Sequence, residues 1–192
     1  MKPVWIVMPA FLAVSLFGQE QLISDKIESG GFGGPVWKMT RLNGEAALIG
    51  GGRGGWIINH TFVIGGGGYS TLHDVKTDLI GTGGKPLHLR MEYSGLELEV
   101  VGHSERVLHW TVQALFGGGR IRLREHDPGH ETSSDGFAVV DANVNAEVNV
   151  LQWLRVNAGA GYRLAFGIES QGLGNGDIGG PEVQVTLKFG KF

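Results

Sequence analysis

Adjacent histidine and serine side chains occur in the sites of hydrolases and acyltransferases, and the chain has one such pair at His103 and Ser104. A nucleophilic serine needs a base within hydrogen-bond reach and a third group that orients this base. The pair lies in an expected short turn, where a turn-forming serine and a solvated histidine are the plainer explanation. His109 is expected to face inward beside Thr111 and Gln113, as part of a hydrogen-bonded network. No triad can be assembled, so we predict no catalytic residue and no enzyme.

A second cluster has side chains that bind divalent metals through imidazole and carboxylate groups. It consists of His126, Asp127, His130 and Glu131. Its spacing does not match the helical H-E-x-x-H pattern, and the intervening Pro-Gly indicates a turn in an exposed loop. We predict no metal and no cofactor, and keep metal binding by this loop as a minor alternative.

Gly50, Gly52 and Gly55 match the dinucleotide-binding pattern G-x-G-x-x-G. That motif works only where a helix follows and its N-terminus holds a pyrophosphate. Here the β-type run from Trp56 to Ile58 and a hairpin follow instead. The nucleotide interpretation therefore fails, and the glycines are expected to relieve crowding where strands bend.

Composition narrows the choice further. The chain has no cysteine, which excludes disulfides, thiolate metal sites and a lipidation cysteine. The net charge is −3 and lysine and arginine are scattered, so no basic stripe indicates nucleic acid as a partner. Glycine accounts for 34 of 192 residues, well above the average of about 7%.

The start of the chain is typical of a secretory signal peptide. Lys2 precedes an apolar run from Val4 to Phe17, and small or polar residues follow at Gly18 and Gln19. This run is shorter than the roughly 20 residues of a membrane-spanning helix. We predict a signal peptide over 1–19, a periplasmic leader over 20–34 and one domain over 35–192.

Eight β-strands are predicted in this domain, and helix is nearly absent, because no segment keeps a 3.6-residue period. They span 36–42, 45–58, 61–70, 86–101, 106–125, 136–150, 154–167 and 181–192. Several alternate strictly: Val140, Ala142 and Val144 share one face, and Asp141 and Asn143 the other.

Two of these strands change phase at glycine. In 86–101 the change falls at Ser94 and Gly95, and in 106–125 it falls at Gly117 to Gly119. A β-bulge at each point would keep one face apolar throughout. We predict two such bulges.

Connector lengths alternate between short and long. Short turns at 59–60, 102–105 and 151–153 alternate with long polar loops at 71–85, 126–135 and 168–180. Outer-membrane barrels have short periplasmic turns and long outer loops, which places both termini in the periplasm. The first outer connection, Asn43-Gly44, is an exception because it is a tight hairpin signal.

Aromatic residues fall near both strand ends, as in the interface girdles of such barrels. The predicted membrane-interface aromatics are Trp37, Trp56, Trp110, Trp153, Tyr69, Phe137, Phe166 and Phe192. A soluble β-sandwich whose tryptophans close the ends of its core remains the alternative.

If the apolar faces meet lipid, the polar faces fill the lumen, which in an eight-stranded barrel is about wide enough for side chains alone. Charges buried there must be paired, so a structural plug is expected. The predicted lumen network comprises Arg90, Glu92, Glu97, Glu99, Arg120, Asp141, Glu147, Arg155, Arg163 and Lys188. Lys38, Glu45, Arg53, Arg122 and Glu182 are further candidates.

Residues 35–192 resemble the small outer-membrane β-barrels of the OmpA/OmpX-like group, above all the glycine-rich barrels of Bacteroidota. The resemblance lies in the elements IGGGRGG at Ile49, IGGGGYS at Ile64 and LFGGGRI at Leu115, and in the ending VTLKFGKF. It implies the outer membrane of a Gram-negative cell, contact with its lipid, and assembly by the barrel-insertion machinery through Phe192. This residue departs from the common form, because it is out of phase with Phe189.

The sequence thus predicts an all-β chain, a closed antiparallel up-and-down eight-stranded transmembrane β-barrel. We expect a non-enzymatic outer-membrane protein with a lumen plugged by charges and long loops exposed for interaction or envelope integrity. The alternatives are a narrow porin-like channel for small or apolar solutes, a lipid-modifying enzyme, and a soluble lipocalin-like binder. The extracellular partner is left open.

Overall fold

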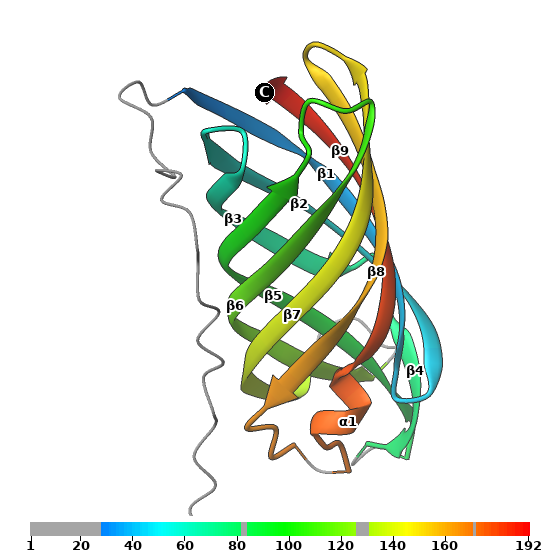
Figure 1. Ribbon diagram of the computed structural model, residues 1–192. Helices are drawn as coiled ribbons and strands as arrows, with labels where there is room; N and C mark the ends of the chain where they lie inside the picture. Colours follow the sequence, from blue (N-terminus) through cyan, green and yellow to red (C-terminus); the bar gives the residue numbers. More distant parts are fainter. Residues whose placement is uncertain (1–27, 82–83, 126–130, 171) are drawn as a thin grey trace, which may run out of the picture.

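The computed structural model of the chain is a closed, tilted β-barrel (Figure 1). It describes residues 28–81, 84–125, 131–170 and 172–192. The predicted signal peptide, the first part of the predicted leader, and His126 to His130 of the loop weighed as an alternative metal site lie outside these residues.

All strands of the barrel are antiparallel to their neighbours. They are β1 (Ser29–Leu42), β2 (Glu45–Ile58), β3 (Phe62–Thr71), β4 (Val75–Ile80), β5 (Pro86–Gly102), β6 (Leu108–Glu125), β7 (Glu131–Leu151), β8 (Leu154–Phe166) and β9 (Gly180–Lys191). The order is β3-β2-β1-β9-β8-β7-β6-β5, and pairing of β3 with β5 closes the ring. The predicted closed eight-stranded barrel is confirmed, with β4 as an additional short strand that pairs with β5.

The two ends of the barrel differ (Figure 1). One end carries the β2–β3, β5–β6 and β7–β8 turns together with the start of β1 and the end of β9, and is named the turn end. The other carries the β1–β2 turn, β4 and α1 (Asn175–Ile178), and is named the loop end. Asn43 (φ 51°) and Gly44 (φ 79°) both have positive φ. This is the geometry that a two-residue type I′ hairpin requires, and asparagine and glycine adopt it readily.

The first strand is longer than predicted. β1 begins at Ser29 and pairs there with Ile58 of β2, so residues 29–34 belong to the barrel and not to a leader. The glycines of this segment give no alternation of apolar and polar residues, which is the pattern on which the strand predictions rest. Its backbone nevertheless pairs with β2 throughout, from Ser29 to Leu42.

The predicted long loop at 71–85 is wrong in part, because Thr71 still belongs to β3 and Val75–Ile80 form β4. β4 continues the line of β3 along β5: Ser70 pairs with Glu92, and Val75 then pairs with Leu89. The loop at 126–135 is also shorter than predicted, because β7 already begins at Glu131. In β4 the buried Val75 and Thr77 alternate with the exposed Lys76 and Asp78, as in a strand with one face in water, so this segment extends the barrel wall.

The two predicted bulges are wrong as well. β5 and β6 pair without a register shift from Leu87 opposite Glu125 to Gly102 opposite Trp110. The apolar residues therefore change sides: Leu89 is buried inside the barrel, whereas Leu98 is exposed on its outside. In β6, Phe116 faces outward, and Ile121 faces inward.

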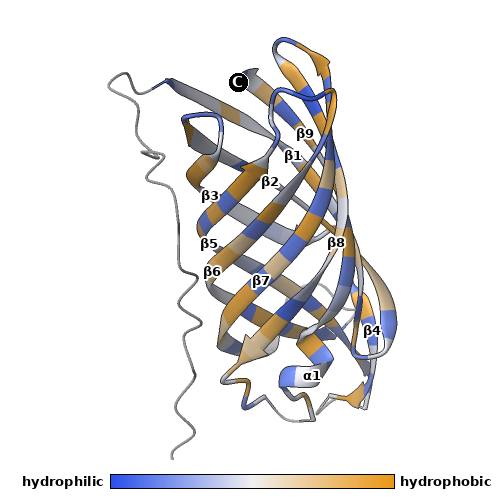
Figure 2. Cartoon of the chain, in the orientation of Figure 1, coloured by the Kyte–Doolittle hydropathy of each residue, from blue (hydrophilic) through white to orange (hydrophobic). Residues whose placement is uncertain are grey.

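The barrel consequently has two zones. Towards the turn end its interior is mostly polar, with a small apolar cluster around Phe32, and its exterior is apolar; towards the loop end its interior holds the main apolar core. Figure 2 shows the alternation of hydrophilic and hydrophobic residues along the strands. α1 lies at the loop end, where the buried Ile178 joins that core. No helix among the described residues is long and apolar enough to span a membrane.

Candidate functional site

Buried charged side chains fill the part of the barrel nearer the turn end. Apart from a buried histidine, those in the described residues are the basic Lys38, Arg53, Arg155, Arg163 and Lys188 and the acidic Glu97, Glu99, Asp141, Glu147 and Glu182. Their formal charges balance. Because a charge in a low-dielectric interior is tolerated only with partners, the pairing of these groups decides whether such an interior is stable.

The Asp141 group consists of Lys38, Asp141, Arg163 and Glu182. It borders the apolar core, because Tyr93 of that core donates a hydrogen bond to Asp141 Oδ2 at 2.8 Å. Lys38 Nζ lies 2.6 Å from Asp141 Oδ2 and 2.7 Å from Glu182 Oε1. Arg163 Nη1 lies 2.9 Å from Glu182 Oε2, and Arg163 Nε donates to the carbonyl oxygen of Ile178 in α1 at 3.0 Å. This group therefore connects four strands and ties α1 to the barrel interior.

The Glu99 group lies nearer the turn end. It consists of Arg53, Glu97, Glu99, Glu147, Arg155 and Lys188. Glu99 accepts hydrogen bonds from Arg53 Nη2 at 2.6 Å and Lys188 Nζ at 2.5 Å. Lys188 also forms an ion pair with Glu147, so its single positive charge serves two carboxylates.

Neutral polar side chains extend the Glu99 group across the interior. Arg53 Nη1 donates to Gln113 Oε1 at 2.8 Å, and Gln184 Nε2 donates to Asn145 Oδ1 at 2.8 Å. His109 lies in the same interior with Nε2 3.1 Å from Glu147 Oε1. It is thus a member of the network, as expected, and its partner Glu147 is already shared with two cations.

The structure places the predicted lumen residues in two different environments. Glu97, Glu99, Asp141, Glu147, Arg155, Arg163 and Lys188 are buried inside. Arg90, Glu92 and Arg120 instead lie exposed on the outer surface, and their placement in the lumen was wrong. They belong to the loop-end zone, where the inward positions of β5 and β6 are apolar and the outward ones polar.

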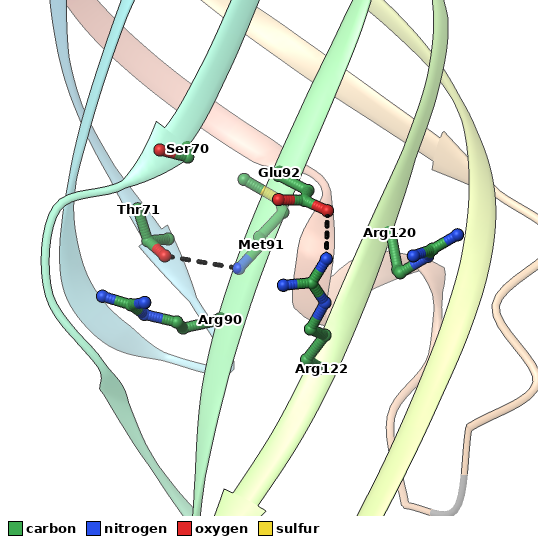
Figure 3. Close-up of a pocket in the computed structure, with 7 residues that line it drawn as sticks. All are labelled: Ser70, Thr71, Arg90, Met91, Glu92, Arg120 and Arg122. Carbon is green, nitrogen blue, oxygen red and sulfur yellow. Dashed lines mark hydrogen bonds and ion pairs between the residues drawn. The ribbon is translucent and has the colours of Figure 1, made fainter. Parts of the chain in front are cut away.

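These outward charges form a cluster on β5 and β6 (Figure 3). Arg122 Nη2 lies 2.7 Å from Glu92 Oε1, and Arg90 Nε lies 2.7 Å from Asp74 Oδ1. Arg120 stands opposite Glu92 in the strand register. A cavity of about 140 Å³ lies among these residues, Ser70 and Thr71. The sequence contained a signal for this cluster, namely the phase changes that we interpreted as bulges.

The predicted interface aromatics fall into an exposed set and an inward-facing set. Trp37, Trp56, Trp110, Trp153 and Phe166 are exposed on the outer surface. The prediction for the other three was wrong: Tyr69 and Phe137 belong to the buried core, and Phe192 packs against the inner cluster that contains Phe32. Tyr69 donates a hydrogen bond to Glu97 Oε1 at 2.5 Å. Tyr69 and Phe137 occupy inward positions because they lie in the loop-end zone.

The adjacent pair His103 and Ser104 lies in the β5–β6 turn at the turn end. His103 is exposed with a φ of 59°, and the Ser104 carbonyl oxygen accepts a hydrogen bond from Asn149 Nδ2 at 3.0 Å. The pair therefore has the features of a structured turn.

Among the described residues no three histidine, cysteine, aspartate or glutamate side chains gather where they would hold a metal ion.

No protein-family model matches the chain, and no curated protein sequence matches it. Among solved structures it is similar to neisserial surface protein A (NspA), with a TM-score of 0.54 and 9% identity over 86% of this chain and 97% of NspA. It also matches Ail, the attachment invasion locus protein of Yersinia pestis, with a TM-score of 0.49 and 10% identity over 84% of this chain and 97% of Ail. The likeness to NspA shows the fold alone: this chain and NspA share the architecture of a small closed β-barrel.

Proposed function

We propose that the chain is a non-enzymatic integral outer-membrane protein: a closed, non-conducting barrel that anchors a rigid projecting end outside the cell. One observation carries this proposal. Near Ser94 on β5 and Gly118 on β6, the apolar residues change from the outward to the inward face of the strand, and the polar residues change the other way. Towards the turn end the outward side chains are apolar, as contact with lipid requires. Towards the loop end the outward side chains of β5 and β6 are polar, as in contact with water. The exchange therefore marks the outer boundary of the membrane.

The exterior of the turn-end zone supports the membrane assignment. Large apolar side chains such as Trp56, Leu98, Trp110, Val144 and Leu164 are exposed there. A soluble protein rarely leaves a continuous apolar surface of this kind in water. The apolar outward positions of β7 run from Ala138 to Val150, which is long enough for the roughly 9–11 residues with which a tilted strand crosses the membrane. The glycine-rich elements support kinship with the Bacteroidota-type barrels that they resemble.

The interior supports a closed lumen. The balanced ion pairs of the Asp141 and Glu99 groups occupy its cross-section, and the apolar core lies between them and the loop end. Ion passage would require several of these pairs to separate while they are buried, and breaking a buried pair costs about 3–5 kcal/mol. The loop end, which carries α1 and β4, is the surface that we assign to contacts outside the cell.

The narrow channel is the second candidate, and one observation favours it. Asn143 Oδ1, Asn157 Oδ1 and Gln184 Oε1 are buried in the interior without a hydrogen-bond partner. Buried polar atoms of this kind usually bind water, and a file of water molecules is the start of a conducting path.

Planar-bilayer recording tests the two candidates against each other. The refolded barrel is first shown to be inserted, by its faster gel migration without boiling than after boiling. Inserted wild-type barrel is expected to give no discrete conductance steps. Reproducible steps from inserted protein would contradict the closed lumen and establish the channel.

A further inference from the structure

The outer wall of β5 and β6 has an apolar hollow at membrane depth. It has a volume of about 670 Å³ and is lined by side chains that include Phe62, Ile64, Leu98, Val112 and Phe116. All five are outward-facing residues of β3, β5 and β6. A lipid acyl chain has the apolar chemistry that such a hollow accepts.

Between this hollow and the arginine cluster, outward positions of β5, β6 and β7 carry glycine or serine, namely Ser94, Gly118 and Gly136. Gly118 follows Phe116 among the outward positions of β6, and Gly136 stands opposite Arg120 on β7. An open hollow of about 700 Å³ lies over Ser94, Gly118 and Gly136. The glycines thus leave room for a bulky group between the apolar surface and the charges above it.

The arginine cluster lies at the next level. Arg120 is four residues beyond Phe116, which is about 13 Å along an extended strand. Among the described residues Arg120 forms no ion pair. The pairs Arg122–Glu92 and Arg90–Asp74 are partly exposed. Exposed ion pairs are weak, so these guanidinium groups are available to exchange a carboxylate for a phosphate.

We propose that this wall binds one lipid of the outer leaflet, with its phosphomonoester headgroup on Arg120 and Arg122 and an acyl chain on the Phe116 hollow. A phosphomonoester carries more charge and more terminal oxygens than a phosphodiester, and the planar arginine fork matches it with two hydrogen bonds. The inference rests on the proposed function, because only a membrane-inserted barrel presents this wall to lipid.

The test measures lipid binding to the folded, detergent-solubilised barrel by native mass spectrometry. The probes are short-chain phosphatidic acid, short-chain phosphatidylglycerol, which is a phosphodiester, and glycerol 3-phosphate without acyl chains. We expect phosphatidic acid to bind about tenfold more tightly than phosphatidylglycerol, because a hydrogen bond between two charged groups is worth at least that factor.

The double variant Arg120→Gln/Arg122→Gln is expected to lose this preference. The matched control is Arg41→Gln, which removes an exposed arginine from the loop end of β1, away from β5 and β6 in the ring. Equal affinity for both lipids, an unchanged preference in the double variant, or an equal loss in the control would overturn the proposal. Glycerol 3-phosphate that binds as tightly as phosphatidic acid would overturn the lipid assignment.

Gel migration of every sample with and without boiling separates this inference from the proposed function. A chain that never forms a heat-modifiable barrel contradicts the proposed function itself. A folded barrel without a phosphomonoester preference contradicts only the lipid site.

Discussion

Lys188 shows at the scale of single residues how the interior is balanced. Its ammonium group lies between Glu99 and Glu147, which are both buried. Replacing it with the apolar methionine keeps much of the volume and leaves two carboxylates with less positive charge. Because an uncompensated buried charge costs about 3–5 kcal/mol, Lys188→Met is expected to lower the free energy of unfolding by that amount.

Urea unfolding of the barrel in lipid vesicles measures this effect. The matched control is Lys191→Met, since Lys191 is exposed on the same strand. The control should change the free energy of unfolding by no more than about 0.5 kcal/mol. Similar unfolding midpoints for both variants would show that the interior does not depend on this ion pair.

The polar composition of the interior could be predicted from the sequence, but the membership of individual charges could not. Asp141 and Arg163 lie on strands that keep one apolar face throughout, so their side was predictable. Arg90 and Arg120 lie beyond a phase change, where the same alternation fits either a bulge or a change of surroundings. Local sequence does not record whether a strand segment lies in lipid or in water, and this decides which face is polar.

At the scale of the strands, β5 and β6 pass through two surroundings with one continuous register. Leu123 lies in the apolar core of the loop-end zone, whereas Leu98 points outward towards lipid. Leu123→Ala should therefore leave a cavity and cost about 2–5 kcal/mol. Leu98→Ala removes the same atoms from the membrane-facing surface and should cost clearly less.

Both leucine variants are compared with the wild type by unfolding in vesicles. Equal losses would indicate that Leu98 and Leu123 face the same surroundings. That result would restore the bulges that the pairing of β5 with β6 excludes.

Glycines set how closely neighbouring strands approach. A Cβ atom on Gly65 would lie 2.0 Å from the Gly54 oxygen and 2.6 Å from the Gly55 Cα, and both are backbone atoms of β2. On Gly68 the nearest atom would be the Ser94 Cβ at 3.8 Å, an ordinary contact. Gly65→Ala is thus expected to force β2 and β3 apart and cost at least about 1–3 kcal/mol.

The yield of heat-modifiable barrel after refolding measures the consequence. Gly68→Ala is the control on the same strand and should refold like the wild type. If Gly65→Ala refolds equally well, the approach of β2 and β3 is looser than the structure shows.

For the whole molecule, the number of strands and the closed ring were predictable, because alternation and turn signals recur along the chain. The long loops were not, since extensions of the wall such as β4 are polar on one face and contain turn-forming residues. The orientation of the barrel in the membrane follows from the loop end, which we expect outside the cell. Gly176 lies in α1 at that end, and Gln152 lies in the β7–β8 turn at the turn end.

Cysteine labelling on intact cells tests this direction, because the chain has no cysteine of its own. A membrane-impermeant maleimide should label Gly176→Cys and leave Gln152→Cys unlabelled, while disrupted cells should show labelling of both. No atom comes within 4 Å of a Cβ at position 176, so this change is not expected to disturb the fold. The reverse pattern would invert the molecule in the membrane.

The central claim is that the membrane ends where the side chains of β6 change from apolar to charged. Val112, Phe116 and Arg120 all face outward on this one strand. Single cysteines at these positions are treated with the impermeant maleimide on both sides of the vesicle membrane, and all three should react once the barrel is denatured. The account predicts that in the folded barrel position 120 reacts and positions 112 and 116 do not. Equal reaction at all three positions would contradict it, because the whole wall would then lie in water.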